Sequence, residues 1–280
     1  MGEGRPVPPG DRRRLTRVVI LNGRRVDPAR ACIPIDDPAV RGGEGIFETM
    51  RARRGAVPFL DRHLDRLAAS VAALGMAGMP PRDAIARDVH AAVAAAGDGL
   101  LRVRVTATPG PTLVVDAQEV RIDPATRRNG LRAVSCRGYW VPQNPLAEHK
   151  TLARIPFARA GRAADAAGAD TALLLDPDGR LGEAVTANVF AVIDGALCTA
   201  PVRGLLPGVT RDAVLAAEPV REVALEEADW RRAAEMFLTS GIQGAVPVVE
   251  VDGAPVGDGR PGPVTLRVAA ALDALLDGCR

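Results

Sequence analysis

Helical and strand-like hydrophobic patterns follow one another along this 280-residue chain without the regular strand–helix–strand rhythm of a doubly wound nucleotide-binding fold. Residues 61–75 place apolar side chains on one face of a predicted helix, and residues 81–96 predict a second helix. Residues 100–108 instead alternate apolar with polar side chains, which is typical of a half-buried strand. The mixture predicts an α+β protein, and the length suits two modest domains or one large one.

Composition shifts suggest where the chain divides. Residues 1–17 are rich in Arg, Pro and Gly without a following apolar stretch, so we expect a disordered leader rather than a signal peptide. The prolines of residues 141–146 indicate an extended linker. We therefore expect a small N-terminal α/β domain at residues 18–140 and a larger C-terminal domain at 147–280. Further predicted elements are strands at 16–23 and 131–135, helices at 153–167, 208–217 and 264–276, and hairpin turns at Asp176–Gly179, Asp194–Gly195 and Asp252–Gly253.

Charge and cysteine patterns exclude several classes of partner. The net charge is only +2 and the arginines are scattered among acidic residues, which argues against a nucleic-acid groove or a membrane-binding patch. No apolar run reaches the roughly 18–20 residues that span a bilayer. The cysteines are widely separated, which predicts reduced thiols in a soluble cytoplasmic protein and no metal site.

A bias in the basic residues singles out Lys150. All but one of the 36 basic residues are arginine, and Lys150 is the exception. Arginine can serve as a surface charge or an ion-pair partner. It cannot replace an amine that must lose its proton and form a Schiff base, because guanidinium stays protonated. The bias therefore indicates amine chemistry at Lys150, with a chance survivor as the alternative on composition alone.

Four further segments accompany the lysine: Arg41–Arg51, His63–Leu67, Leu181–Phe190 and Gly204–Arg211. In this order they resemble the class IV aminotransferases, a family that includes branched-chain and D-amino-acid aminotransferases and aminodeoxychorismate lyase. The resemblance covers residues 18–275. It implies the two-domain α+β fold of type IV pyridoxal-phosphate enzymes, with the cofactor in the cleft between the domains. It also implies a homodimer in which both chains contribute to each site.

The resemblance assigns a role to each matching residue. Lys150 holds pyridoxal phosphate and moves protons, and Glu183 faces the pyridine nitrogen. A helix that begins after Gly208 offers its N–H groups to the phosphate anion. Taken singly, each residue also has an ordinary structural explanation, such as a strand carboxylate or a helix start. The remaining expected cofactor contacts are Arg66 and Thr210 at the phosphate, Leu206 and Val209 beside the ring and phosphate loop, and Ser240 and Gly241 in a second phosphate loop.

Departures from the aminotransferase pattern favour one activity. Tyrosines that bind substrate in the aminotransferases have no counterparts, since Tyr139 is the only tyrosine. Thr49 replaces a glycine of the branched-chain enzymes, and Ala187 precedes Asn188. These features predict a lyase that converts 4-amino-4-deoxychorismate to 4-aminobenzoate and pyruvate, with Thr49 assisting proton delivery. Ala153 departs from the lyases too, because many relatives have asparagine there.

Two alternatives stay open. The first is an aminotransferase of the D-amino-acid or branched-chain type, which would act on an amino acid or amine with a 2-oxo acid acceptor. The second is a binding or scaffold protein without catalysis. Retention of Lys150 in a chain otherwise emptied of lysine argues against a scaffold. Both catalytic hypotheses require a small-molecule amino substrate.

Overall fold

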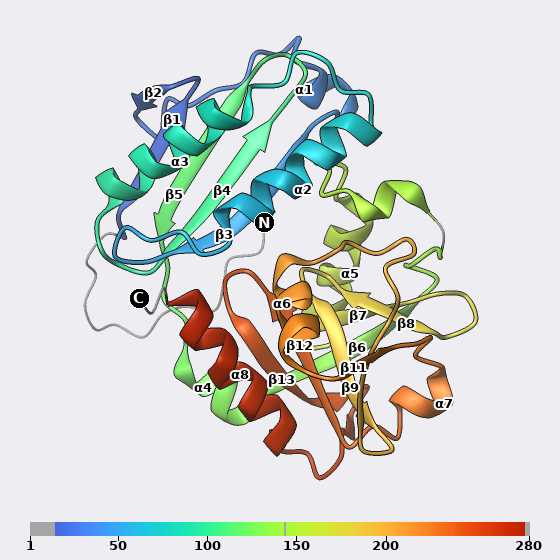
Figure 1. The fold of residues 1–280 in the computed structure, drawn as a ribbon. Coiled ribbons are helices and arrows are strands. Elements are labelled where there is room, and N and C mark those ends of the chain that lie inside the picture. The colour runs from blue at the N-terminus through green and yellow to red at the C-terminus, as the bar shows by residue number, and fades with distance from the viewer. Residues whose placement is uncertain (1–14, 143, 278–280) are drawn as a thin grey trace.

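The computed structural model describes residues 15–142 and 144–277, and most of the expected leader at 1–17 lies outside them. Two sheets lie one above the other, each with its own helices (Figure 1). This arrangement is the predicted two-domain α+β fold. Among the described residues, no helix has the length and apolarity needed to cross a bilayer.

The smaller sheet is antiparallel and is built from the first part of the chain. Helices α2 (Leu60–Ala73) and α3 (Arg82–Ala96) cover one of its faces (Figure 1), and a short α1 (Pro38–Gly42) lies at its edge. The alternation predicted for residues 100–108 is confirmed, since every second residue of β4 is buried. Both predicted helices are confirmed within two residues. The sheet order is β2 (Arg24–Val26), β1 (Arg17–Leu21), β5 (Leu113–Glu119), β4 (Leu101–Ala107) and β3 (Ile46–Ala52).

The larger sheet contains all three predicted hairpin turns. They join β7 to β8, β9 to β10 and β13 to β14. A pairing of Glu183 with Asn188 also joins β8 to β9, so that β9, β12, β13, β6, β7 and β8 close into a ring. Its strands are β6 (Leu131–Arg137), β7 (Thr171–Leu175), β8 (Leu181–Ala184), β9 (Asn188–Ile193), β10 (Ala196–Thr199), β11 (Val220–Glu222), β12 (Glu235–Ser240), β13 (Gly244–Val251) and β14 (Ala254–Pro255).

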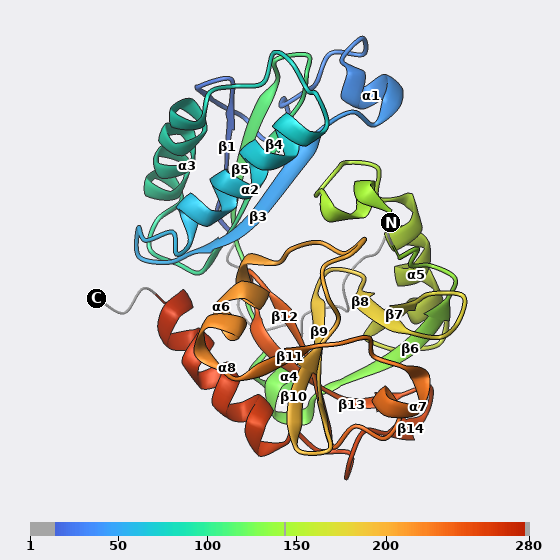
Figure 2. The same cartoon turned by 45° about the vertical axis from the view of Figure 1, so that its right-hand side comes forward.

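Helices pack against two different groups of strands in this larger sheet. The helices α6 (Val209–Ala217) and α8 (Pro263–Leu276) lie against β12 and β13, and α5 (Ile155–Ala166) lies against β6 and β7 (Figure 2). Short helices α4 (Pro124–Asn129) and α7 (Glu227–Trp230) complete this half, with a 3-10 turn at Pro145–Glu148. Because aromatics are few, the core consists mainly of Ala, Val and Leu, with one stacked pair, Phe190 and Phe237, whose ring centroids are 5.0 Å apart.

The chain enters the larger sheet earlier than the sequence suggested. Strand β6 forms parallel pairs with β7 and β13, and α4 packs on β13. The expected linker at 141–146 therefore follows a strand of the larger sheet. Parallel partners distant in the chain leave no local pattern, which is why the proline-rich segment was the more visible candidate. We propose that the domain boundary lies at residues 120–123.

Candidate active site

Lys150 is held where the two domains meet. The segment that carries it pairs with the start of β3, through the Phe47 N–H to the Lys150 carbonyl and the Leu152 N–H to the Gly45 carbonyl, each 2.9 Å. A Cβ at position 45 would lie 2.5 Å from Leu152 Cδ1 and 3.2 Å from the Ala107 carbonyl oxygen, so a larger residue there would displace Leu152. The Lys150 Nζ lies 4.8 Å from the centroid of the Phe47 ring. The motif around Thr49 thus positions the lysine through backbone pairing.

The amine of Lys150 is poised close to neutrality. Burial of the ammonium and the charges of Arg66 and Arg154 together lower its pKa to about 8, although Glu48 and Glu183 partly oppose the fall. An amine must be unprotonated to attack a carbonyl or to accept a proton. A substantial fraction of Lys150 is therefore reactive near neutral pH, whereas an ordinary surface lysine is almost fully protonated there.

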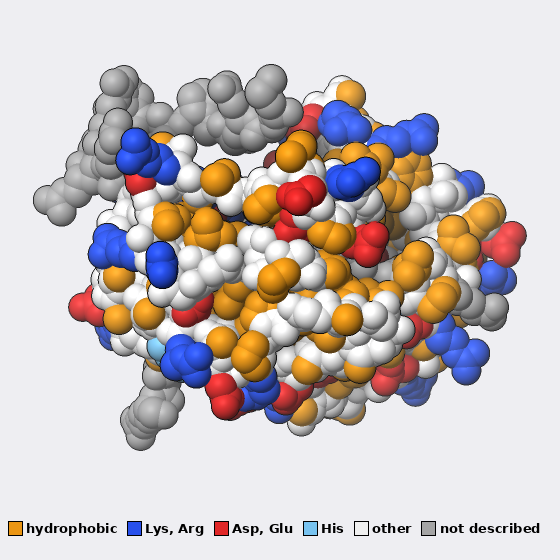
Figure 3. All heavy atoms as spheres, turned by 90° about the horizontal axis from the view of Figure 1, so that it is seen from above, with side chains coloured by type: hydrophobic (Ala, Val, Ile, Leu, Met, Phe, Trp, Pro, Cys, Tyr) orange, Lys and Arg blue, Asp and Glu red, His pale blue; other side chains and the backbone are white. Residues whose placement is uncertain are grey.

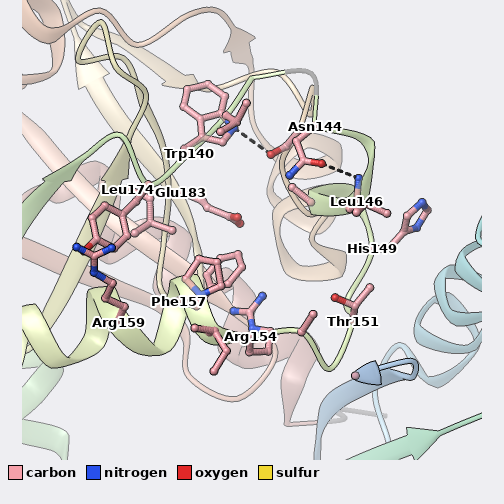
Figure 4. A pocket seen from close by; sticks show the side chains of 18 of the residues that line it. Trp140, Asn144, Leu146, His149, Thr151, Arg154, Phe157, Arg159, Leu174 and Glu183 are labelled. Carbon is pink, nitrogen blue, oxygen red and sulfur yellow. Dashed lines mark hydrogen bonds between the residues drawn. The ribbon is translucent and has the colours of Figure 1, made fainter. Parts of the chain in front are cut away.

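Glu183 points into the same region from β8. The residue is buried, and Figure 4 shows its carboxyl directed into a cavity. Burial raises its pKa to about 7, although the positive charges of Arg154 and Lys150 partly oppose the rise. A buried carboxyl of this kind is well suited to a ring nitrogen that shares or gains a proton, because such a partner compensates the buried charge.

An anion site is built around the start of α6. Gly208 caps this helix, so the N–H groups of Val209 and Thr210 have no partner within it. A Cβ at position 208 would lie 2.0 Å from the Asn188 Oδ1, so glycine is required there. Asn188 in turn donates from Nδ2 to the Leu206 carbonyl at 3.0 Å, which holds the preceding loop.

A second element, the end of β12, faces this anion site. Ser240 and Gly241 line the same small cavity as Thr210, and their contact with the phosphate stays a prediction. Thr239 lines it too, and its buried hydroxyl has no hydrogen-bond partner among the residues the structure describes. An unpartnered buried hydroxyl is costly, so it marks a position where a ligand oxygen would be stabilised.

Arg66 connects the anion site to a buried cluster. Its Nε and Nη2 donate to the two oxygens of Glu48 at 2.8 and 2.6 Å, and its Nη1 donates to the Pro207 carbonyl at 2.7 Å. His63 Nδ1 lies 2.8 Å from the same carboxylate. Burial alone would raise the pKa of Glu48, but the His63 bond and the Arg66 charge lower it to about 2. Arg66 therefore anchors the loop before α6, and it lines the small cavity. Its phosphate contact stays a prediction.

Two adjoining cavities make up the site. The larger has a volume of about 730 Å³ and includes Trp140, Leu146 and Phe157 in its lining. The smaller contains Lys150 and the anion site, and both are lined by Arg154 and Glu183. This connection lets a ligand extend from the phosphate-binding end past the lysine into the larger, mostly apolar space.

The structure places the remaining sequence candidates at the small cavity. Leu206, Val209 and Thr49 all line it. A Cβ at Gly241 would lie 3.0 Å from the Thr49 carbonyl oxygen, so Thr49 belongs to the anion end. The role of Thr49 in proton delivery stays a prediction.

These groups match the needs of pyridoxal phosphate. The cofactor requires an amine for its aldehyde, a carboxylate for its pyridine nitrogen and donors for its phosphate. Lys150, Glu183 and the α6 start with the orphan Thr239 hydroxyl supply all three around one cavity. Within the described ranges, no three His, Cys, Asp or Glu side chains cluster as metal ligands do. The fold and the site together define a fold-type IV pyridoxal-phosphate enzyme.

Comparison with known proteins places the chain more narrowly. The family description "Amino-transferase class IV" matches residues 45–251. The chain is 28% identical to branched-chain-amino-acid aminotransferase-like protein 2 of Arabidopsis thaliana, over 89% of this chain and about half (48%) of that longer protein. It is also 28% identical to the D-alanine aminotransferase of Bacillus licheniformis, over 91% of this chain and 95% of that one.

A solved structure shows the same fold over almost the whole length. The T.th. branched-chain amino acid aminotransferase, complexed with N-(5'-phosphopyridoxyl)-L-glutamate, superposes with a TM-score of 0.86. The two chains are 26% identical, and the match covers 95% of each. The chain belongs to the class IV aminotransferase family.

Two residues of the site escaped the sequence analysis. Thr239 lies in the Thr239–Ser240–Gly241 run, but nothing local marks which of its hydroxyls is buried and unpartnered. Arg154 follows Lys150 by four residues and lines both cavities. Its nearness to the lysine was a usable signal, because residues close to a cofactor lysine in sequence tend to lie close in space.

Proposed function

We propose that this chain is an aminotransferase that exchanges the amino group of an amino acid with a 2-oxo acid. The observation that carries the proposal is the buried amine of Lys150, which shares one cavity with Glu183 in a chain of the class IV family. The leading sequence hypothesis, a lyase for 4-amino-4-deoxychorismate, finds no support among the relatives named above, which are aminotransferases. The alternative aminotransferase, of branched-chain or D-amino-acid type, agrees with them better.

The residues divide the work of the reaction. Pyridoxal phosphate, when bound, supplies an electron-accepting ring that makes the substrate Cα–H acidic. Lys150 holds the cofactor aldehyde before substrate enters, and its Nζ then takes the proton from Cα. Glu183 keeps a proton on the pyridine nitrogen. The N–H groups at the start of α6, with the hydroxyls of Thr210 and Thr239, bind the phosphate.

The large cavity supplies the environment for the substrate. The indole of Trp140 is held by a hydrogen bond from Nε1 to the Gly204 carbonyl at 2.9 Å. With Phe157 and Leu146 it forms apolar walls of the cavity that would receive the substrate. Such walls suit an apolar amino-acid side chain more than a strongly polar one.

The activity is tested by following the cofactor spectrum in half-reactions. Purified enzyme is mixed with the L- and D-forms of leucine, alanine and glutamate in the absence of any acceptor. We expect at least one of these amino acids to convert the visible band to the pyridoxamine form, and 2-oxoglutarate to restore it. A band that is unchanged by every amino acid, together with turnover of 4-amino-4-deoxychorismate without an acceptor, would support the lyase instead.

We also propose that the protein is a homodimer. Large apolar side chains remain exposed beside the larger cavity, with exposed fractions of 58% for Val141, 59% for Leu146 and 74% for Ile155. Figure 3 shows further apolar side chains exposed among charged ones on one face. Large apolar side chains exposed together beside one cavity are typical of an interface with another chain.

Light scattering after size-exclusion chromatography tests the dimer. The wild type is expected at twice the chain mass of 29.3 kDa, and Ile155→Glu with Leu146→Glu at or near the monomer mass. The exposed Arg162→Glu of the same helix is the control, expected to leave the mass unchanged. A wild-type protein that is monomeric at micromolar concentration would contradict the proposal.

A further inference from the structure

Arg154, which lines both cavities, and the nearby Arg104 are partly buried and form no salt bridge with a carboxylate among the described residues. Other arginines with buried side chains do have one. The pairs are Arg51 with Asp277, Arg66 with Glu48, and Arg211 with Glu222. A desolvated guanidinium without an anion is unfavourable, so an unpaired one beside a ligand cavity indicates a ligand anion.

Arg154 is held in a fixed orientation. Its Cζ lies 3.3 Å from the centroid of the Phe157 ring, and its Nη2 donates to the Val185 carbonyl at 2.8 Å. Figure 4 shows its guanidinium beside Phe157, in the cavity into which Glu183 also points. One hydrogen bond leaves most of its five N–H donors free. Stacking and the backbone contact pre-organise the guanidinium, so binding an anion would restrict few additional rotamers.

Arg104 approaches the same region from the smaller sheet. It lies opposite Thr49 in the pairing of β3 with β4, and its Cζ is 3.7 Å from the centroid of the Phe47 ring. The same ring lies 4.8 Å from the Lys150 Nζ. Burial and, to a smaller extent, the charge of Arg104 lower the pKa of Arg154 to about 10, although the charge of Glu183 opposes the fall. The two guanidinium groups therefore repel one another across a space beside the lysine.

We propose that Arg154, supported by Arg104, binds the carboxylate of the amino-acid substrate and of the 2-oxo acid. The planar guanidinium suits a bidentate carboxylate, whose charge would offset the repulsion between the two cations. Glu183 does not supply this compensating negative charge, because in the proposed function its carboxylate pairs with the pyridine nitrogen. The inference rests on the proposed function and makes it narrower: amino acids and 2-oxo acids are substrates, whereas amines that lack a carboxylate are poor ones.

Binding of a non-reactive pair of probes tests the inference apart from turnover. The pair is 4-methylvalerate and 4-methylvaleramide, which share one apolar chain and differ in the negative charge. Each is titrated into the holoenzyme, and Kd is read from the change in the cofactor spectrum. The wild type is expected to bind the carboxylate about 10-fold or more tightly than the amide, as hydrogen bonds to charged groups imply.

The variants then assign that preference to a residue. Arg154→Gln is expected to raise the Kd of the carboxylate about 10- to 100-fold with little change for the amide. Arg154→Lys should recover part of the loss, because an ammonium keeps the charge without the planar fork. Arg104→Gln should give a smaller loss in the same direction. Arg162→Gln, an exposed arginine of α5 outside both cavities, is the matched control and should have no effect.

The outcomes separate this inference from the proposed function. Equal weakening of both probes by Arg154→Gln, or none, would overturn the role of Arg154. If Arg154→Gln fails to hold the cofactor, Arg154→Lys and Arg104→Gln are used in its place. Equal weakening of both probes in these variants, or no weakening, would overturn the proposed site. A wild type that discriminates between the probes yet transfers no amino group would retain the carboxylate site and refute the aminotransferase. A wild type that transfers amino groups but binds the two probes equally would support the aminotransferase and refute the carboxylate site.

Discussion

Lys150→Ala is expected to lower kcat by about 10²–10⁴-fold, the range found when a positioned proton-transfer group is removed. The variant is also expected to lose the visible band of the lysine-bound cofactor. Both effects follow from the loss of one amine, and Lys150 carries the only primary side-chain amine in the chain. No other side chain can replace it at the aldehyde, since every other basic residue beyond the three histidines is arginine.

Borohydride reduction followed by peptide mass spectrometry measures the attachment directly. Wild-type protein should carry the reduced cofactor on the peptide containing Lys150, and Lys150→Ala should carry none. Lys150→Arg is the matched variant that keeps a positive charge, and it should behave as Ala does. His149→Gln changes the adjacent residue, whose Nδ1 lies 3.0 Å from the Ser70 hydroxyl, and should keep the label. Labelled cofactor on any peptide of Lys150→Ala would refute the assignment.

Glu183→Gln is expected to reduce kcat by about 10²-fold or more, because an amide cannot keep the pyridine nitrogen protonated. The same substitution should stabilise the cofactor-free protein at alkaline pH. Burial raises the pKa of Glu183 to about 7, above the ordinary value of 4.5. The stabilising, protonated form is therefore fully present below pH 4.5, and its contribution is lost as the pH rises through 7.

Urea unfolding of the cofactor-free proteins at pH 4.5 and pH 8 measures this second effect. Glutamine is neutral at both values, so the variant should exceed the wild type in unfolding free energy at pH 8, by on the order of 3 kcal/mol. The difference should nearly vanish at pH 4.5. Glu119→Gln on the smaller sheet is the control for loss of a carboxyl and should show no such pH dependence. A variant less stable than wild type at pH 8 would contradict the claim that the buried Glu183 carboxylate destabilises the cofactor-free protein.

Local patterns in the sequence predicted most of the elements that carry the site. The alternation in β4, the periodicity of α2 and α3, and the three Asp-Gly hairpin turns depend on residues close in the chain. In two of these turns Asp194 and Asp252 have positive φ angles, of 51° and 53°, and a glycine follows each. Such backbone preferences act over two or three residues, so they are legible before any tertiary contact is known.

Contacts between residues distant in the chain could not be predicted in this way. The parallel pairing that places β6 in the larger sheet joins Leu131 to Val248. The Glu48 carboxylate hydrogen-bonds with His63 and accepts from Arg66, and Arg66 also donates to the Pro207 carbonyl. Each of these contacts links segments that are separated by many residues and depends on how the sheets and helices pack. Neither the domain boundary nor the anchoring role of Arg66 could therefore be derived from spacing.

The sequence by itself indicated amine chemistry at Lys150, because the motifs around this lone lysine resemble those of one enzyme family. Its motifs also determined the family and hence the fold. The tertiary structure alone decided the electrostatics: burial moves the pKa of Lys150 to about 8 and that of Glu183 to about 7. It also decided that Arg104, on β4 of the smaller sheet, lies near Arg154, which precedes α5. Desolvation and pairing depend on what surrounds a group in space, and that environment is assembled only when the two domains pack together.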